Sequence, residues 1–152
     1  MEKNKKKYGL LVAVALCVCL LGGFLANLAQ TDFGKVTKKT ILFESNSGHT
    51  ISADVLIPNE AGEENPLPAI VWAHGGNANK ERSDNFQIEW ARRGYVVVSF
   101  DLYGHGESEV LNDTEWFDNG RGLYDTVQYV ATLPYVDADR IAVSGHSRGG
   151  NT

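Results

Sequence analysis

The sequence predicts an α/β fold: a mostly parallel sheet with helices on both faces, entered through an antiparallel hairpin and preceded by one N-terminal transmembrane helix. Two observations lead to this fold class. Residues 8–31 contain no Asp, Glu, Lys or Arg, and beyond residue 68 short apolar runs alternate with stretches of helical periodicity. Continuous apolar runs separated by helices are typical of parallel strands that are covered on both faces.

Composition and charge narrow the class of protein. The chain has 152 residues, 43% hydrophobic and 22% charged, which is the balance of a globular protein. The formal net charge is −5, and beyond residue 29 acidic side chains outnumber basic ones by 18 to 10. This acidic balance argues against a nucleic-acid partner. Both cysteines, Cys17 and Cys19, lie in the apolar run, so the remainder offers no cysteine for a disulfide or a metal site.

The apolar run predicts a membrane segment. Residues 8–29 are expected to form a transmembrane signal anchor behind a basic flank at residues 1–7. As a helix the charge-free run would reach about 36 Å, and the hydrocarbon core of a bilayer is about 30 Å thick. The four lysines of the flank predict that the N-terminus stays inside and that the C-terminal part lies outside the cytoplasm.

A cleaved signal peptide is the alternative, because a basic segment followed by apolar residues is also its signature. In that case the protein is secreted after cleavage. We favour the anchor, since the apolar core of a signal peptide is typically about 7 to 15 residues long. In addition, Ala26 and Ala29 form no clean A-x-A cleavage site.

The folded part is expected at residues 40–152, behind a linker at residues 30–39. Residues 40–45 and 51–57 are rich in β-forming side chains and flank a turn-like Asn-Ser-Gly-His segment, which predicts an antiparallel hairpin. Residues 59–68 are acidic and contain Gly and Pro, as surface loops do.

The next segments predict alternating strands and helices. The three strands are expected at residues 69–73, 95–100 and 140–144, and the helices at residues 83–93 and between residues 114 and 133. In the first helix, Ser83 is a suitable N-cap, Phe86 and Trp90 share one face, and Gly94 ends the helix before the next strand. This rhythm predicts a parallel sheet.

The most informative motif, G-x-S-x-G, directly follows the last predicted strand. It consists of Gly145, His146, Ser147, Arg148 and Gly149. On a tight strand-to-helix turn the serine is exposed as a nucleophile, and the glycines avoid collisions of Cβ atoms as the turn closes. Ser147 is therefore the candidate nucleophile, although the motif alone is a weak signal.

Two further motifs follow the earlier strands. One is His74, Gly75 and Gly76, and the other runs from Asp101 to Ser108 with the pattern D-x-x-G-H-G-x-S. The carboxyl ends of strands in an open parallel sheet meet along one edge, where ligands bind. All three loops are therefore expected to converge.

The three motifs, in this order, resemble the α/β-hydrolase superfamily over residues 40–152, most closely its dienelactone-hydrolase-like and acylaminoacyl-peptidase-like serine hydrolases. The resemblance implies the N-terminal half of an α/β-hydrolase fold with Ser147 as nucleophile. It also implies an oxyanion hole formed by the main-chain N–H groups of Gly76 and Arg148, with Asn77 as second choice for the first donor. Structural roles at the edge of the site fall to His74, Gly75, Asp101, His105, Gly145 and Gly149.

The triad of this superfamily runs Ser, then Asp or Glu, then His along the chain. Only five residues follow Ser147, and all four histidines precede it. We therefore expect the acid and the histidine beyond Thr152, so that the sequence is an N-terminal fragment of a longer hydrolase and is inactive by itself.

The predicted function is a serine hydrolase that cleaves carboxylic ester bonds of a small-molecule substrate through an acyl-enzyme at Ser147. No metal and no organic cofactor is needed for this chemistry. Two alternatives stay open at this point. One is a serine peptidase of the same fold, and the other is a non-catalytic membrane-tethered module that keeps the fold without the triad.

Overall fold

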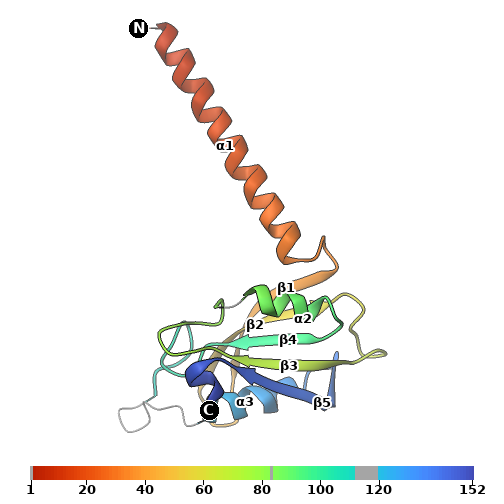
Figure 1. The fold of residues 1–152 in the computed structure, drawn as a ribbon. Coiled ribbons are helices and arrows are strands. Elements are labelled where there is room, and N and C mark those ends of the chain that lie inside the picture. Colours follow the sequence, from red (N-terminus) through yellow and green to blue (C-terminus); the bar gives the residue numbers. More distant parts are fainter. Residues whose placement is uncertain (1, 83, 112–119) are drawn as a thin grey trace.

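The computed structural model describes residues 2–82, 84–111 and 120–152. It shows a long N-terminal helix that projects from an α/β domain (Figure 1). In chain order the elements are α1 (Glu2–Gln30), β1 (Val36–Glu44), β2 (Thr50–Pro58), β3 (Leu67–Ala73), α2 (Asp84–Ala91), β4 (Val96–Phe100), α3 (Arg121–Val130), β5 (Val136–Gly145) and the short 3-10 helix η2 (Ser147–Gly150).

The five strands form one mixed sheet in the order β1-β2-β4-β3-β5. Strands β1 and β2 pair antiparallel, as expected for the leading hairpin, and β2 also pairs antiparallel with β4. Strand β3 pairs parallel with β4 on one side and with β5 on the other. The predicted antiparallel hairpin leading into parallel strands is therefore confirmed, but among the described strands two pairings are parallel and two antiparallel, so the sheet is mixed instead of mostly parallel.

Helices cover both faces of this sheet. Strand β4 shows this, because its successive residues point to opposite faces and pack against different helices. Val97 packs with Leu56 and with Ala91 of α2 in one apolar cluster. Val98 belongs to the larger cluster on the other face, which includes Val130 of α3. All of β4 is buried, which explains why four of its five residues are apolar and only Ser99 is polar.

Strand boundaries differ from the sequence prediction at both edges of the sheet. Strand β1 begins at Val36 instead of residue 40, so only residues 31–35 separate it from α1. The added residues include two lysines on an exposed edge strand, where polar side chains are tolerated and give no apolar signal. Strand β5 likewise begins at Val136 instead of residue 140, ahead of a register shift in its pairing with β3.

Helix α2 shows the contacts that its sequence predicts. The rings of Phe86 and Trp90 stack at 6.4 Å, and Trp90 also contacts Trp72 of β3 at 5.5 Å. Gly94 has φ +84, and the next N–H, that of Tyr95, donates to Trp90 O at 3.3 Å. This is the Schellman ending for which a glycine is suited. The proposed cap Ser83, and residue 114 at the expected start of the second helix, lie outside the described residues.

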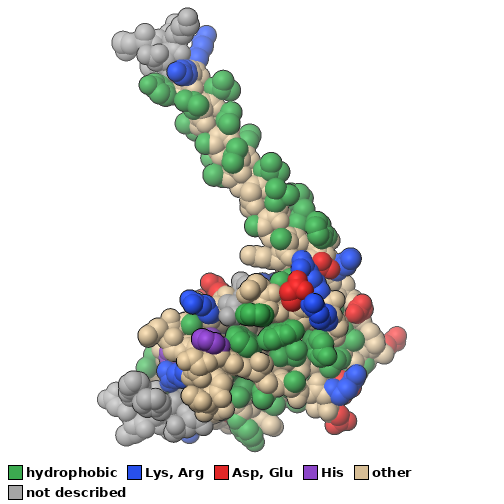
Figure 2. All heavy atoms as spheres, in the orientation of Figure 1, with side chains coloured by type: hydrophobic (Ala, Val, Ile, Leu, Met, Phe, Trp, Pro, Cys, Tyr) green, Lys and Arg blue, Asp and Glu red, His purple; other side chains and the backbone are tan. Residues whose placement is uncertain are grey.

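Helix α1 is long and apolar enough to cross a membrane over Lys6–Gln30, with a mean hydropathy of 2.6. Its apolar side chains project into the surroundings, away from the domain (Figure 2). A signal sequence near the N-terminus can also form a helix that is this long and apolar. The helix is thus compatible with an anchor and with a signal peptide.

The end of α1 is tied to helix α2. The Arg92 guanidinium donates to the carbonyl oxygen of Ala29 at 3.2 Å and pairs with the carboxylate of Asp32 at 3.0 Å. A cation at the carboxyl end of a helix also offsets the partial negative charge of the helix dipole there. Arg92 therefore holds the last turn of α1 against the domain.

The strand register shows at which end of the strands α1 joins the sheet. Val36, the first residue of β1, pairs with Pro58 at the end of β2, and Leu56 of β2 pairs with Val97 near the start of β4. The helix therefore enters beside the amino ends of the parallel strands. The three motif loops lie at the carboxyl ends of these strands, which is the opposite end of the sheet.

Candidate active site

Ser147 is the first residue of η2 and is separated from the end of β5 by His146 alone. Its φ angle is +54, in the left-handed region that non-glycine residues rarely adopt. Such a conformation costs about 1 to 3 kcal/mol and persists only where surrounding contacts enforce it. The side chain is exposed, so this strained turn presents a hydroxyl group at the surface of the sheet edge.

The two motif glycines explain how the turn closes. A Cβ atom on Gly145 would collide with the main chain of Gly149, and one on Gly149 would collide with the carbonyl oxygen of Ala73. The main chain of the turn is thus packed against itself and against the end of β3. Glycine is required at both positions because no side chain fits there.

The loop after β3 lies against this turn. The main-chain N–H of His146 donates to Ala73 O at 3.1 Å. A Cβ atom on Gly75 would lie 3.5 Å from the Cβ of Ser147, and one on Gly76 would lie 4.0 Å from the Arg148 side chain. Glycine at position 75 lets the main chain of the loop approach the serine closely, which an oxyanion donor requires.

His74 connects this loop to the one after β4. Its ring is buried; Nε2 accepts the main-chain N–H of Leu102 at 3.1 Å, and Nδ1 contacts Gly75 O at 2.7 Å. Since a main-chain N–H can only donate, Nδ1 carries the proton and donates to the carbonyl. Burial lowers the pKa of His74, which keeps the ring neutral. With both nitrogens engaged, His74 holds two loops together.

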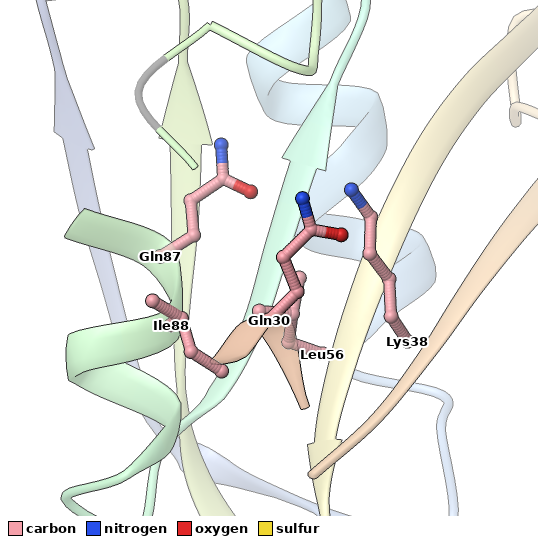
Figure 3. A pocket seen from close by; sticks show the side chains of 5 residues that line it. All are labelled: Gln30, Lys38, Leu56, Gln87 and Ile88. Carbon is pink, nitrogen blue, oxygen red and sulfur yellow. The ribbon is translucent and has the colours of Figure 1, made fainter. Parts of the chain in front are cut away.

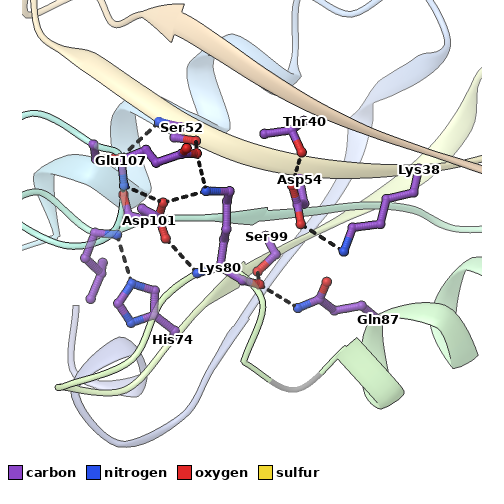
Figure 4. A network of polar contacts seen from close by, with 12 residues as sticks. Lys38, Thr40, Ser52, Asp54, His74, Lys80, Gln87, Ser99, Asp101 and Glu107 are labelled. Atoms are coloured by element: carbon purple, nitrogen blue, oxygen red, sulfur yellow. Dashed lines mark hydrogen bonds and ion pairs between the residues drawn. The ribbon is translucent and has the colours of Figure 1, made fainter. Parts of the chain in front are cut away.

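Asp101 organises the D-x-x-G-H-G-x-S loop from a fully buried position. Its carboxylate accepts the main-chain N–H of Lys80 at 2.6 Å, the Lys80 ammonium group at 2.9 Å and the N–H of Glu107 at 3.0 Å (Figure 4). A Cβ atom on Gly106 would overlap the same carboxylate. The conformation of this loop therefore depends on Asp101, as a structural role requires.

Lys80 was not singled out by the sequence. The residue is only 5% exposed, and its ammonium group also donates to Glu107 at 2.7 Å. Burial opposes the charge, but the hydrogen bonds to Glu107 and Asp101 outweigh it and raise the pKa of Lys80. A lysine in a polar loop carries no signal of burial in one sequence, so only the fold shows this contact.

The third connection joins the turn at Ser147 to the loop after β4. The Arg148 guanidinium donates to Nε2 of His105 at 3.4 Å, and Nδ1 of His105 contacts Tyr103 O at 3.1 Å. The rings of His74 and His105 lie 5.2 Å apart. The three loops therefore meet at one edge of the sheet, as the topology predicts. Neither histidine has a free nitrogen for Ser147.

A second polar cluster fixes the loop after β4 from its other side, and sequence reasoning missed it too. The Tyr103 hydroxyl donates to Asp125 of α3 at 2.9 Å and lies 3.0 Å from the Ser45 hydroxyl, and Ser47 donates to the same carboxylate at 2.7 Å. Burial raises the pKa of Tyr103, which keeps its hydroxyl protonated as a donor. The cluster ties the hairpin turn, this loop and α3 together.

Two hollows lie beside α2, away from these loops. The smaller, of about 10 Å³, is lined by Gln30, Lys38, Leu56, Gln87 and Ile88 (Figure 3). That is about the space of one water molecule, too little for a substrate. The other is an open groove of about 530 Å³ lined by Ala29, Gln30, Asn85, Phe86, Ile88, Glu89 and Arg92. Neither lining includes a residue of the three motif loops. In the part of the chain that the structure describes, no group of three or more His, Cys, Asp or Glu is placed to hold a metal ion.

A serine on a sharp strand-to-helix turn, beside a glycine loop at the carboxyl edge of a parallel sheet, defines the α/β-hydrolase class. Comparison with known proteins identifies the family. The sequence matches the X-Pro dipeptidyl-peptidase (S15) family over residues 47–152, and the chain belongs to this family of hydrolases.

Individual relatives include peptidases and esterases. The uncharacterized Pseudomonas aeruginosa protein PA2218 is 32% identical over 114 residues, which are 73% of this chain and 30% of that protein. Its crystal structure gives a TM-score of 0.60 at 30% identity, over 72% of this chain and 35% of that chain. Dipeptidyl-peptidase 5 of Porphyromonas gingivalis is 27% identical over 117 residues, 70% of this chain and 17% of that protein. The structure of a bacterial heroin esterase gives a TM-score of 0.64 at 25% identity, over 90% of this chain and 42% of that chain.

The chain spans about a third of the first two curated relatives, 30% of PA2218 and 37% of the uncharacterized Escherichia coli protein YcjY. The family match over residues 47–152 includes the serine turn and the two other motif loops. The activity and substrates of the whole protein are therefore matters of proposal.

Proposed function

We propose that the complete protein is a serine hydrolase that cleaves carboxylic esters through an acyl-enzyme at Ser147. The observation that carries this proposal is the strained Ser147 turn, with φ +54, packed against the glycine loop at Gly75. A hydroxyl held in this way, within reach of main-chain donors, is suited to attack a carbonyl carbon.

In the proposed reaction, Ser147 Oγ forms a bond to the carbonyl carbon while its proton passes to a histidine base. The tetrahedral intermediate then expels the alcohol, which takes up that proton, and a water molecule releases the acid from the acyl-enzyme. We place the base and its acidic partner beyond Thr152, in the chain order of the superfamily.

The negative oxygen of the intermediate is assigned to the main-chain N–H groups of Gly76 and Arg148, with Asn77 as the alternative first donor. The contacts of Gly75 and Gly76 with the serine turn support this assignment. Removing one such donor typically costs about 10² to 10³ in kcat. His74, Asp101 and His105 are assigned structural roles, since their polar atoms are used to join loops.

Esters are the proposed substrates, in line with the bacterial heroin esterase whose structure matches 90% of the chain. A serine peptidase is the second candidate, and the family match over residues 47–152 favours it. Comparing kcat/KM for p-nitrophenyl acetate and for a Gly-Pro p-nitroanilide separates the two. A higher value for the anilide would make the protein a peptidase.

The proposed location is the membrane, with a single span at residues 8–29 and the site outside the cytoplasm. Because α1 joins the sheet at the end of the strands opposite the motif loops, this arrangement turns the site away from the bilayer. Release after signal cleavage is the alternative, and it leaves the site unchanged.

A fluorophosphonate probe tests the proposed nucleophile in the complete protein. We expect the wild type to be labelled and Ser147→Ala to lose both labelling and esterase activity, by about 10⁶ in kcat. Full activity of Ser147→Ala would exclude the mechanism. A folded wild type that resists the probe and hydrolyses neither substrate would instead support the non-catalytic module.

A further inference from the structure

A buried ion pair lies directly behind the glycine loop. The Lys80 ammonium group is 2.9 Å from the Asp101 carboxylate and 2.7 Å from that of Glu107. The Lys80 side chain is 6% exposed and that of Asp101 is 0% exposed. A buried ion pair of this kind is costly unless each charge is fully matched, and removing one partner leaves the other charge uncompensated.

The main chain of Lys80 is held as firmly as its side chain. Its N–H donates to Asp101 at 2.6 Å, and its carbonyl oxygen accepts the Ser99 hydroxyl at 2.6 Å and the Gln87 amide at 3.1 Å. Figure 4 shows Lys80 between these groups, with contacts to the carboxyl end of β4 and to α2. The position of Lys80 is therefore fixed on all sides.

The loop from residue 74 to residue 80 is anchored at both of its ends. At the first end, His74 accepts the N–H of Leu102; at the other, Lys80 binds Asp101. The two anchors reach consecutive residues directly after β4, Leu102 and Asp101. Between them, Asn77 has φ +55, a conformation that needs such support in a non-glycine residue.

On this basis we propose that Lys80 is a positioning residue: with Asp101 it fixes the loop that carries the oxyanion donor against Ser147. The inference rests on the proposed hydrolase function. A misplacement of about 1 Å in a catalytic group can cost about 10² in rate. Loss of Lys80 therefore weakens binding of the transition state more than binding of the substrate, so kcat falls while KM changes little.

The test compares Lys80→Met with Lys38→Met in the complete protein, using p-nitrophenyl acetate. Lys38 is a matched control, since it forms a 3.0 Å ion pair with the buried Asp54 on β2, outside the motif loops (Figure 4). We expect Lys80→Met to lower kcat about 10- to 100-fold with KM within about twofold of the wild type. Lys38→Met should leave both constants unchanged, and Lys80→Arg should restore part of kcat, since a guanidinium group can donate to both carboxylates.

A phenylboronic acid gives a second readout that general loss of stability does not produce. It bonds to the serine oxygen and places an oxygen in the oxyanion hole, so its affinity should fall as kcat falls in Lys80→Met. If Lys80→Met does not fold, Ser99→Ala removes only the hydrogen bond to the Lys80 carbonyl, and we expect a drop of about threefold or more in kcat at unchanged KM.

The outcomes separate this inference from the proposed function. If folded Lys80→Met keeps Ser147-dependent esterase activity with an unchanged kcat, the positioning role alone is overturned. The same result in Ser99→Ala, where that variant replaces Lys80→Met, would also overturn it. Equal losses of kcat in Lys80→Met and Lys38→Met would also overturn it. Activity that does not depend on Ser147 would overturn the proposed function itself.

Discussion

Nε2 of the buried His74 accepts the main-chain N–H of Leu102 at 3.1 Å. This one contact joins the loop after β3 to the loop after β4 and settles which ring nitrogen carries the proton. Because the acceptor nitrogen must stay unprotonated, the contact exists only in the neutral form of the ring. His74 therefore links two loops of the candidate site through a hydrogen bond that is lost when the ring is protonated.

A pH effect on stability follows from His74. Burial lowers its pKa below the ordinary value of 6.5, so below pH 6.5 the unfolded chain binds a proton more readily than the folded one. The stabilising contribution is complete above the unfolded pKa and is lost as pH falls toward the folded pKa. In urea unfolding, the free energy of unfolding of the wild type should be lower at pH 5.5 than at pH 7.5. This difference should be smaller in His74→Gln. The control is His49→Gln, which changes a partly exposed ring; a loss of the effect there instead of in His74→Gln would contradict the assignment.

Two glycines of the site should respond very differently to alanine. In Gly149→Ala the new methyl group meets the carbonyl oxygen of Ala73, and neither main chain can move away. In Gly76→Ala the nearest atom is 4.0 Å away, an ordinary contact. We expect Gly149→Ala to lose at least about 3 kcal/mol of unfolding free energy and Gly76→Ala less than about 0.5 kcal/mol. Chemical denaturation measures both, and similar losses would mean that the turn is not packed as described.

The sequence predicted those parts of the fold that depend on local pattern. Strand β4 is apolar except for Ser99 because both of its faces are buried, and the turn glycines mark places where no side chain fits. Strand β1 was predicted too short, because an edge strand needs few apolar residues. Topology alone then brought the three loops together, since parallel strands end at one edge.

The polar contacts behind the site could not be predicted. Lys80 and Asp101 are 21 residues apart, and Ser47 and Asp125 are 78 apart. Whether such residues meet depends on the completed packing of the sheet. In one sequence, a buried lysine and an exposed lysine look the same. The resemblance to a family located the proposed nucleophile, whereas the residues that hold its neighbours in place became visible only in the structure.

The 152-residue chain is expected to show no turnover of activated esters. Since we propose that the base lies beyond Thr152, the Ser147 hydroxyl should stay protonated; His74 and His105 use both of their nitrogens elsewhere. An oxyanion hole alone would give at most about 10³ to 10⁴ over water. Hydrolysis of p-nitrophenyl acetate by the purified chain, compared with its Ser147→Ala variant, measures this. A rate that depends on Ser147 would show that the chain supplies its own base.

The anchor prediction concerns the segment from Leu10 to Leu28. We expect it to stay attached and to hold the protein in the membrane, because the helix is long enough to span and follows a basic flank. Carbonate extraction should leave the protein in the pellet with its original N-terminus. Soluble protein with a new N-terminus near Gln30 would identify a cleaved signal instead.

The proposed oxyanion donors can be separated from their side chains in the complete protein. Gly76→Pro removes the main-chain N–H of the glycine loop, and we expect kcat to fall about 10² to 10³. Arg148→Ala keeps the main-chain N–H and removes only the guanidinium that contacts His105, so kcat should change less than about tenfold. Gly76→Ala, which keeps the N–H and fits the space, is the control for Gly76→Pro. A folded Gly76→Pro with the kcat of Gly76→Ala would assign the first donor to Asn77, whose N–H lies one residue further along the same loop.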